Sequence, residues 1–520
     1  MKTKIYNPIL LLTLAFFLAA SCSEDFLDKQ PLDQRVESNF YQTQEDAQEA
    51  LIAVYDVLGW NTVVGFHPLP MFSDIASDDS FAGGASRNDA PNIIEVDKHN
   101  IRTTNGEVLG LWKKYYIGIY RANLYLEKIE GIDADPDFIS RTVAEVKFIR
   151  AYYYFDLLRV FEHVPLLTET LKSQSEYSQP QASPEQIYNQ IATDLTEAIP
   201  NLPDVIPAVE NGRVSKWAAK ALLARVYLYV NGVYGANLNG GGKTIDKAAA
   251  LAELEDLIAN SGHQLLTDFA ANFSKAGEFS VESVFEISYS DARPWYDWGY
   301  IQGGEGNIAI QMQGPRVDDP GLELYERGWS FAPVTQGLYD AFEEGDPRRA
   351  ATILHQDEFV GGLTIGYQHT GYFNKKYTTS KEYKPAEGQL ELNWGNNYRV
   401  IRYSDVLLMA AELGSPNAQA YLDEVRGRVG LPSVPATLDN IYQERRVELA
   451  LEGHRYWDLI RRGLNVAEAA ISISGQIGPL YQGDAQEFDV AFKPANKGLF
   501  PIPQTEVDIS NGVYQQNAGY

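Results

Sequence analysis

The sequence predicts a mainly α-helical protein: a scaffold of TPR-like helical hairpins that carries long irregular loop insertions, in which a ligand site is expected. Two observations lead to this prediction. Long segments repeat apolar residues every three or four positions, the period of an α-helix buried on one face. Between them lie stretches rich in Gly, Pro and Asn, which favour turns. Because the chain has a single cysteine, no disulfide framework holds this fold, and it depends on a large core.

Helical periodicity occurs in several long segments of the chain. In one example, apolar residues at Val146, Ile149, Tyr153, Leu157 and Val160 form one stripe, and each such stripe must be buried against a neighbouring element. The predicted helices lie near residues 43–59, 108–130, 137–162, 184–200, 214–234, 245–260, 397–413, 416–429 and 437–462.

The segment 214–234 is rich in small residues on its apolar face. Trp217, Ala221, Ala224 and Leu228 form its stripe, and the alanines would let a second helix approach closely, as stacked hairpins require. No 34-residue self-match is visible, so the hairpin repeat is inferred from this packing pattern and not from repeated sequence.

The remaining regions have the texture of loops. Turn signals such as Gly314-Pro315 concentrate there, and long ordered loops often carry binding sites. We therefore expect one domain over residues 43–520. Its helical scaffold covers about 43–260 and 397–462, and the first of these parts includes a loop-rich stretch at 61–105. The loop-rich ligand-binding insert covers about 261–396, and the irregular C-terminal segment covers 463–520.

The N-terminus has the pattern of a lipoprotein signal peptide, predicted for residues 1–21. Two lysines precede an apolar run over 9–20 that is shorter than the roughly 20 residues needed to span a bilayer. Small residues then lead to Cys22, which stands at the cleavage junction. We expect Cys22 to be acylated and to anchor the chain in a membrane, with residues 22–42 as a lipidated tether.

The chain that follows the signal peptide is strongly acidic. It has 41 basic residues against 70 acidic ones, a formal net charge of −29. Such a field repels phosphate groups, so no nucleic acid partner is expected. No later segment is apolar enough to span a membrane. An acidic extracytoplasmic binder or enzyme remains.

The sequence contains no clear pattern of a metal-binding site or a catalytic site. Seven histidines are spread without the spacing of a helical zinc site, so neither a metal nor another cofactor is expected. Asp74, Asp78 and Asp79 do not fit a calcium loop, although a looser oxygen site stays open. No nucleophile elbow accompanies the many acids, and their abundance alone is no evidence of glycoside cleavage. We predict a protein that is not an enzyme, with a surface glycosidase as an alternative.

Six motifs occur in order along the chain. The most extensive runs from Glu444-Arg445-Arg446 through Glu452-Gly453-His454-Arg455 to Arg461. The others lie at residues 145–166, 221–229, 333–349, 398–412 and 501–520. With the lipidation site they extend over nearly the whole chain, and in this order they resemble the SusD/RagB family of nutrient-binding outer-membrane lipoproteins.

The resemblance implies a non-catalytic cell-surface protein that binds an oligosaccharide or polysaccharide. It also implies delivery of that ligand to a partner, a SusC-like TonB-dependent outer-membrane transporter. Ser23-Glu24-Asp25 resembles a surface-export signal of lipoproteins in the Bacteroidetes, whereas Ala19 stands where leucine is usual in the lipobox. Two alternatives stay open: a peptide-capturing, RagB-like member of the family, and a helical-repeat scaffold with protein partners only.

The segment 444–462 combines an apolar face with many opposite charges. Arginines and glutamates that are partly buried beside apolar side chains must pair with one another or with backbone carbonyls. We therefore predict that these residues hold helices together and contact no ligand.

A sugar ring needs a flat aromatic face for its C–H groups and a few polar partners for its hydroxyls. The run 291–300 places four aromatics in a turn-rich stretch, where helical periodicity cannot bury them all. The first candidate ligand-binding residues are Trp295, Tyr296, Trp298 and Tyr300, with a small satellite core as the alternative. The second set is Phe81 as a platform with Arg87 and Asn88 as polar contacts. Trp329, near Phe331, fits binding and core packing equally.

Overall fold

The fold is described from a computed structural model of the 520-residue chain. The structure describes residues 40–173, 176–298, 305–317, 324–359, 362–475 and 478–520. The predicted signal peptide, the lipidation site Cys22 and the predicted binding residue Tyr300 lie outside the described residues, as does the tether up to residue 39.

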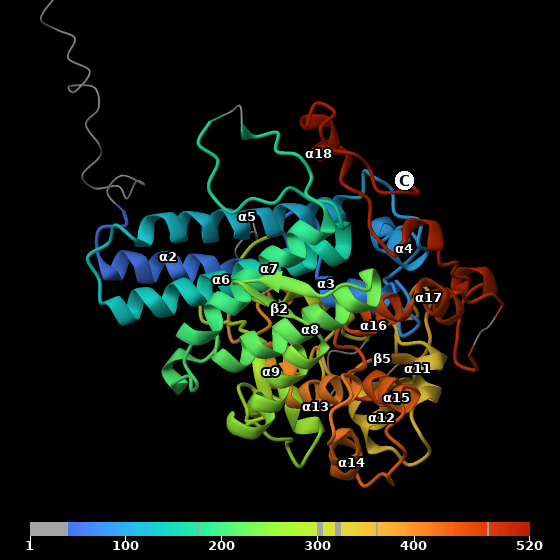
Figure 1. The fold of residues 1–520 in the computed structure, drawn as a ribbon. Coiled ribbons are helices and arrows are strands. Elements are labelled where there is room, and N and C mark those ends of the chain that lie inside the picture. Colours follow the sequence, from blue (N-terminus) through green and yellow to red (C-terminus); the bar gives the residue numbers. More distant parts are fainter. Residues whose placement is uncertain (1–39, 174–175, 299–304, 318–323, 360–361, 476–477) are drawn as a thin grey trace, which may run out of the picture.

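The six long helices predicted in the first half of the chain are confirmed (Figure 1). They are α2 (Gln44–Asp56), α5 (Gly106–Ile129), α6 (Pro136–Phe161), α7 (Pro184–Ala198), α8 (Lys216–Tyr234) and α9 (Lys247–Asn260). Each begins after a side chain that accepts hydrogen bonds from the free N–H groups of the first turn, and Thr43 and Ser183 form complete capping boxes. Polar caps therefore set where these helices start.

The helices pack as antiparallel neighbours through their apolar stripes, as the hairpin prediction required (Figure 1). Ala218, Ala221 and Ala224 of α8 are fully buried. On α5, Gly118 lies against the Tyr153 ring of α6, where a Cβ would come within 2.4 Å of a ring carbon. Small residues thus allow the close approach of these helices.

The second helical block differs from the prediction at two places. Residues 397–413 were expected to form one helix, but Tyr398–Arg402 is strand β6, which precedes α13 (Tyr403–Glu412). The β-branched pair Val400-Ile401 favours a strand, and pairing with β3 (Ser283–Ile287) satisfies its backbone. Local periodicity could not reveal this distant partner.

The predicted helix 437–462 is two helices, α15 (Leu438–Glu448) and α16 (Arg455–Arg462). Between them Leu451 and Gly453 have positive φ angles of 62° and 74°, which end the helical path. A Cβ on Gly453 would lie 2.7 Å from the backbone of Pro70, and its N–H donates to Asp74. The remaining helices of this block are α14 (Ala418–Arg428), as predicted, and α17 (Leu464–Ile471).

Strands are few in the part of the chain that the structure describes, and each pair is antiparallel. β1 (Leu238–Gly240) and β2 (Lys243–Ile245) form a hairpin, β3 pairs with β6, and β4 (Ile353–His355) pairs with β5 (Tyr372–Asn374). The β3–β6 pair joins the residue 261–396 region to the second helical block.

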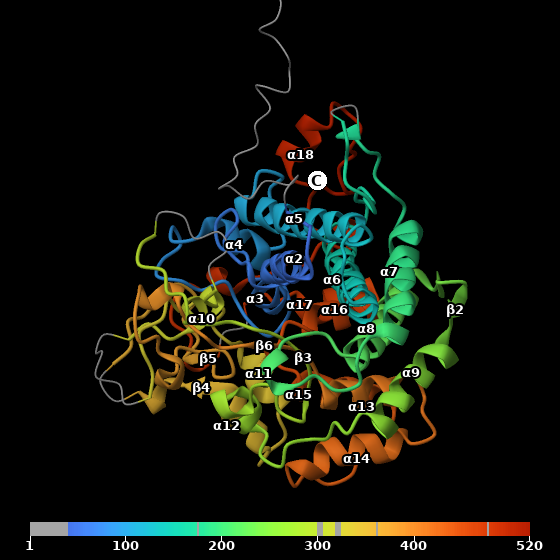
Figure 2. The same cartoon turned by 90° about the vertical axis from the view of Figure 1, so that its left-hand side faces the viewer.

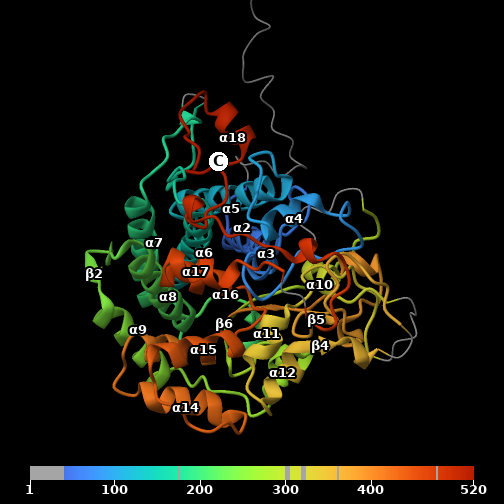
Figure 3. The same cartoon turned by 90° about the vertical axis from the view of Figure 1, so that its right-hand side faces the viewer.

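The loop-rich regions contain short helices that the sequence pattern did not indicate, because six or seven residues are too few to show a stripe. They are α3 (Leu69–Ile75), α4 (Pro91–Asp97), α10 (Ile308–Gln313), α11 (Gln336–Ala341), α12 (Pro347–Thr352) and α18 (Gln504–Ile509). Single 3-10 turns lie at Val57–Gly59, Ile199–Asn201, Ala208–Glu210, Ala270–Phe273, Lys275–Gly277, Gln356–Glu358, Lys381–Tyr383, Leu390–Leu392, Ala485–Phe488 and Pro494–Asn496. Elements α10 to α12 gather on the side away from α7 to α9 (Figures 2 and 3).

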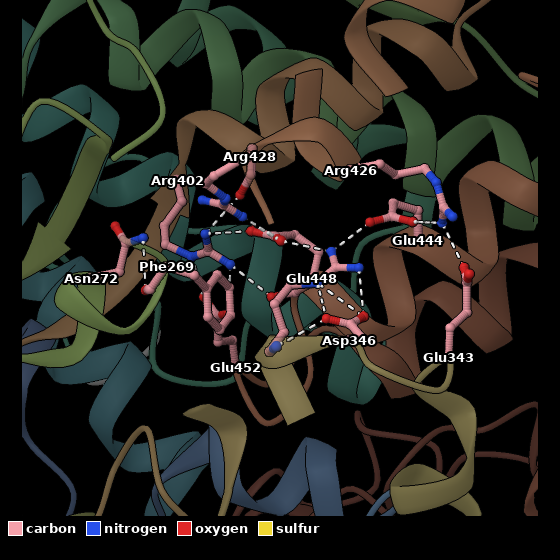
Figure 4. A network of polar contacts seen from close by, with 12 residues as sticks. Phe269, Asn272, Glu343, Asp346, Arg402, Arg426, Arg428, Glu444, Glu448 and Glu452 are labelled. Carbon is pink, nitrogen blue, oxygen red and sulfur yellow. Dashed lines mark hydrogen bonds and ion pairs between the residues drawn. The ribbon is translucent and has the colours of Figure 1, made fainter. Parts of the chain in front are cut away.

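Buried ion pairs hold the second helical block together, as predicted for segment 444–462. At the centre of this charge network, Glu448 accepts hydrogen bonds from Arg348 at 3.1 Å and Arg402 at 2.8 Å, and it also pairs with Arg428 (Figure 4). Burial alone would raise the pKa of Glu448, but these guanidinium groups hold it well below its usual range. The three arginines come from α12, β6 and α14, so one carboxylate ties three elements to α15.

The acids of the 61–105 region belong to similar pairs. Asp78 accepts a hydrogen bond from Arg455 at 2.7 Å, and Asp79 accepts one from Arg446 at 2.9 Å. Asp74 accepts the Gly453 N–H at 3.0 Å. These contacts connect the 61–105 region to α15 and α16, and each of the three acids accepts a hydrogen bond from a protein donor.

Candidate functional site

Three aromatic rings form a row on the side of the molecule that carries α10. Trp298 stacks on Trp329, with ring centroids 6.0 Å apart and planes 26° apart, and Trp329 contacts Phe66 at 5.5 Å. Trp298 is 43 % exposed, whereas Trp329 and Phe66 are partly buried. We call Trp298, Trp329 and Phe66 the aromatic platform. Its outer ring is supported from behind and leaves surface open to a ligand.

The loop that carries Trp298 is held at Trp295. The Trp295 backbone N–H donates to Asn393 at 2.8 Å, and its carbonyl accepts from the Asn393 amide at 2.9 Å and from the Gln389 N–H at 2.7 Å. Its ring is partly buried against the main core. Trp295, the first predicted binding residue, therefore anchors the loop.

Tyr296 points outward from the same loop. It is 62 % exposed, and its hydroxyl donates to Glu387 at 2.7 Å. This hydrogen bond raises the pKa of Tyr296. The ring of Tyr296, two residues before Trp298, is thus accessible, while its hydroxyl is held by Glu387.

Trp329 is positioned by a close crossing of two backbone segments. A Cβ on Gly328 would lie 2.2 Å from the carbonyl carbon of Gly314, so neither position accepts a side chain without a shift. The Trp329 N–H donates to the Gln311 carbonyl at 2.9 Å, and the next residues pair with the strand-like segment 80–84. The predicted turn at Gly314-Pro315 therefore packs against the segment that positions Trp329, the middle ring of the platform.

Phe66 is held by its neighbour His67, which packs beneath α5. The His67 Nε2 accepts the Val63 N–H at 2.9 Å, and the ring leaves no room for a Cβ on Gly110. Burial lowers the pKa of His67 to about 3, and Lys114 adds to this effect. His67 is consequently neutral at physiological pH, as its acceptor role requires.

Arg316 supplies a polar group behind the platform. Its guanidinium donates to the Trp329 carbonyl at 3.2 Å and lies 3.8 Å from the Asp89 carboxylate. Burial lowers the pKa of Arg316, with Arg327 adding to the shift. Within the described residues its Nε atom is buried without a hydrogen-bond partner. Protein covers this atom, so the contacts support a positioning role for Arg316, which links the Trp329 backbone to Asp89.

The structure brings the two predicted candidate loops close together through Arg316, because Asp89 directly follows Arg87 and Asn88. Both of these predicted polar residues are exposed. The prediction for Phe81 is wrong: its ring is 2 % exposed and packs against Phe488 at 5.3 Å. Apolar neighbours from the C-terminal segment cover it, and these are remote in sequence.

Sequence reasoning missed Phe66 and Arg316, and it left Trp329 undecided between binding and core. The available signal for Trp329 was its position after Gly328 in a turn-rich region. Phe66 likewise follows a glycine in the 61–105 stretch. Nothing in the local sequence distinguishes Arg316 from other arginines. Only the folded chain shows that its head group lies against Trp329.

The platform offers a flat aromatic surface, and the exposed Arg87 and Asn88 precede Asp89, whose carboxylate lies 3.8 Å from Arg316. An aromatic face with polar side chains on an adjoining loop suits a ligand with C–H faces and hydroxyl groups, which a saccharide has. No group of three or more His, Cys, Asp or Glu side chains with the geometry of a metal site occurs in the described ranges. In the same part of the chain, no helix has the length and apolarity needed to cross a membrane.

Comparisons with known proteins agree with this chemistry. Residues 360–520 match a profile described as "SusD family", and residues 25–228 match one described as "Starch-binding associating with outer membrane". A SusD-like protein of Formosa agariphila is 28 % identical over 500 residues, which cover 89 % of this chain and 90 % of the relative.

Solved structures are similar over nearly the whole chain. A laminarin-binding SusD-like protein shares 36 % identity with a TM-score of 0.81, covering 92 % of this chain and 100 % of that one. The surface glycan-binding protein A of Bacteroides thetaiotaomicron, solved in complex with laminarihexaose, shares 30 % identity with a TM-score of 0.79, at 92 % and 100 % coverage. On this identity and coverage, the chain belongs to the SusD-like family.

Proposed function

We propose that this protein is a non-catalytic glycan-binding protein whose ligand stacks on the aromatic platform. The observation that carries the proposal is the 43 % exposed Trp298 ring stacked on Trp329. A ring supported from behind offers its remaining surface with little loss of side-chain freedom on binding. The exposed Arg87 and Asn88 are the candidate polar contacts, because they directly precede Asp89, whose carboxylate lies 3.8 Å from Arg316 behind Trp329.

The relatives indicate which glycans to test first. Two similar structures are named for laminarin binding or contain laminarihexaose. Laminarin and laminarihexaose are therefore the first ligands, followed by an array of other glycans. The array is needed because stacking aromatics accept many sugar faces.

The test compares residues 23–520 with the variant Trp298→Ala by isothermal titration calorimetry with laminarihexaose or the best array ligand. Loss of a central aromatic contact costs about 2 kcal/mol, so the affinity should fall roughly 30-fold. Val209→Ala, an exposed apolar residue far from the platform in sequence, is the matched control and should bind like the wild type. Equal affinity of Trp298→Ala and wild type would refute the site.

The array also separates the alternatives. A peptide-capturing protein would bind a tryptic digest and ignore every glycan. A scaffold with protein partners only would bind neither. Release of shortened sugars, seen by thin-layer chromatography after long incubation, would indicate a glycosidase and contradict the non-catalytic proposal.

We further propose that Cys22 is acylated and holds the protein at the outer surface of the outer membrane. The N-terminal sequence pattern and the outer-membrane description of the matching profile support this. Cys22→Ala should leave glycan affinity unchanged and move the protein from the membrane fraction to the soluble one. Continued membrane retention would contradict the anchor.

Delivery of the glycan to a SusC-like TonB-dependent transporter completes the proposal and rests on the family resemblance. The test is co-purification of the full-length lipoprotein from mild detergent, with mass spectrometry of the associated proteins. A large TonB-dependent barrel should be recovered in near-equal amount. Its absence from membranes in which the lipoprotein binds glycan would contradict delivery by this route.

A further inference from the structure

A groove is lined by tyrosines of α5, of the loop residues 176–183 and of the C-terminal segment. Figure 1 shows the loop residues 163–173 and 176–183 above α5. The volume of the groove is about 450 Å³, within the range of roughly 300–1,000 Å³ found for small-molecule pockets. The aromatic residues of the groove are Trp112, Tyr116, Tyr120, Tyr177 and Tyr514. We call this the tyrosine groove. Figures 2 and 3 show α5 between α10 on one side and the loop residues 163–173 and 176–183 on the other.

Exposed aromatic side chains occur at only two places in the part of the chain that the structure describes. Tyr296 and Trp298 are at the platform, and Tyr120 and Tyr177, at 51 % and 64 % exposed, are at the tyrosine groove. Such rings are costly to leave in water, and their gathering at a concave surface indicates a binding site. Solvent-exposed aromatic side chains, the feature that indicates binding at the platform, therefore also occur at the tyrosine groove.

One wall of the groove is a ladder along α5. Trp112, Tyr116 and Tyr120 follow at four-residue spacing, which places them on one face of the helix. The rings of Trp112 and Tyr116 are 5.0 Å apart, and Tyr514 lies 6.1 Å from Trp112 on the far side. The ladder is buried at Trp112 and becomes open at Tyr120.

The opposite wall of the groove is a loop that hydrogen bonds to α5 and to the C-terminal segment hold in place. The Tyr116 hydroxyl donates to the Pro165 carbonyl at 2.8 Å, and Asn123 donates to the Leu167 carbonyl at 3.0 Å. Gln181, at the end of the loop, exchanges two hydrogen bonds with the backbone of Gln515, at 3.1 Å and 2.7 Å. Because α5 and the C-terminal segment hold the loop, a ligand would not have to order these contacts.

Polar groups are present in the groove as well. Burial raises the pKa of Glu506, while Lys113 and a hydrogen bond with Trp112 oppose the shift. Gln179 lines the groove beside Tyr177. The hydroxyl groups of a sugar can form hydrogen bonds with the Glu506 carboxyl, the Lys113 ammonium, the Gln179 amide and the tyrosine hydroxyls. A purely apolar ligand would give the half-buried Glu506 no new hydrogen-bond partner. The net charge of −27 disfavours an acidic ligand.

We propose that the tyrosine groove is a second glycan-binding site, which takes a neutral oligosaccharide segment between Tyr120 and Tyr177. The inference rests on the proposed glycan-binding function and adds a site to it. Two sites on one chain would bind a long polysaccharide more tightly than a short one, through the high effective concentration of the second site once the first is filled.

The experiment uses residues 23–520 with laminarihexaose in calorimetry and with laminarin in affinity gel electrophoresis. The groove variant is Tyr120→Ala with Tyr177→Ala, and the platform variant is Trp298→Ala with Trp329→Ala. Ile509→Ala is the matched control, because Ile509 is 65 % exposed on α18 but does not line the groove. Both groove tyrosines are surface residues, so the groove variant should fold like the wild type.

The wild type should bind two hexasaccharides, and either double variant should bind one. Retardation by laminarin should weaken at least tenfold in the groove variant, and combining all four substitutions should abolish it. Hydrogen exchange should show protection of residues 163–173 by hexasaccharide in the platform variant, where only the groove can bind.

Several outcomes would overturn the inference. If the groove variant binds as many hexasaccharides as the wild type and is retarded equally, the second site does not exist, although the proposed function stands. If the groove variant loses transporter association but keeps full glycan retention, the groove binds protein. If the wild type binds no glycan on the array, the proposed function fails and the second site fails with it.

Discussion

The charge network around Glu448 and the aromatic platform at Trp298 both bring together side chains from distant parts of the chain. They differ in how far those side chains are buried. In the network, carboxylates and guanidinium groups are buried and bonded to one another (Figure 4). At the platform, Trp298 keeps 43 % of its surface open although Trp329 supports it from behind. The difference shows that burial of paired charges marks a structural centre, whereas a supported ring with an open face marks a binding surface.

The largest effect is expected from Glu448→Ala, which leaves several buried guanidinium groups without their shared partner. Breaking a buried ion pair costs about 3–5 kcal/mol, so the free energy of unfolding measured with urea should fall by that amount. Glu343→Ala removes a half-exposed carboxylate at the rim of the same network and should cost less than about 1 kcal/mol. Equal costs of the two would remove the distinction between centre and rim.

The second effect tests whether backbone packing positions the platform. Gly328→Ala places a Cβ against the Gly314 backbone, so it should destabilise the fold by about 1–3 kcal/mol and weaken glycan binding through a shift of Trp329. Gly427→Ala is the control: a Cβ there meets open space in α14, and the change should stabilise by about 0.5–1 kcal/mol. Unchanged glycan affinity in Gly328→Ala would show that Trp329 does not depend on this crossing.

The third effect concerns pH and the residue beneath Phe66. The folded-state pKa of His67, about 3, is below that of the unfolded chain, so its contribution to stability is complete above about pH 6.5 and is lost as pH falls. Between pH 6 and 4, His67→Gln should reduce the pH slope of the free energy of unfolding by about 1.4 kcal/mol per pH unit. The control Ile509→Ala changes an exposed side chain that does not titrate, so it should leave the slope as in the wild type. An unaltered slope in His67→Gln would mean that His67 becomes protonated within the fold.

The smallest effect separates the ring of Tyr296 from its hydroxyl. Tyr296→Phe removes one exposed hydrogen bond to Glu387 and should change stability by less than about 0.5 kcal/mol. Calorimetry should show glycan affinity retained in Tyr296→Phe and reduced in Tyr296→Ala if the ring face contacts the sugar. Equal affinities of both variants and wild type would exclude Tyr296 from the site.

Much of the helical scaffold could be predicted because its signals are local. The stripe from Val146 to Val160 and the caps at Thr43 and Ser183 depend on residues within a few positions of one another. The two wrongly predicted helical segments were determined by contacts with residues far away in the sequence. Tyr398–Arg402 is a strand because of a partner about 115 residues earlier in the chain, and the break near Gly453 accommodates Pro70. Tertiary contacts decided both.

The candidate site shows the same division. Turn-rich composition was sufficient to locate an exposed aromatic loop at Trp298, because helical periodicity could not bury its rings. It could not show that Phe81 is covered by Phe488, or that Trp329 and Phe66 stand behind Trp298. Ring exposure depends on neighbours that are hundreds of residues away.

The sequence by itself determined most of the helical scaffold, the structural role of the charged segment 444–462 and the family, because periodicity, capping and motifs can all be read along the chain without knowledge of its folded contacts. Only the tertiary structure decided which aromatics face water. It placed Trp298 on Trp329, buried Phe81 and assembled the tyrosine groove from α5, the loop 163–183 and the C-terminal segment. Burial is a property of the whole fold, and a binding surface is what the fold leaves uncovered.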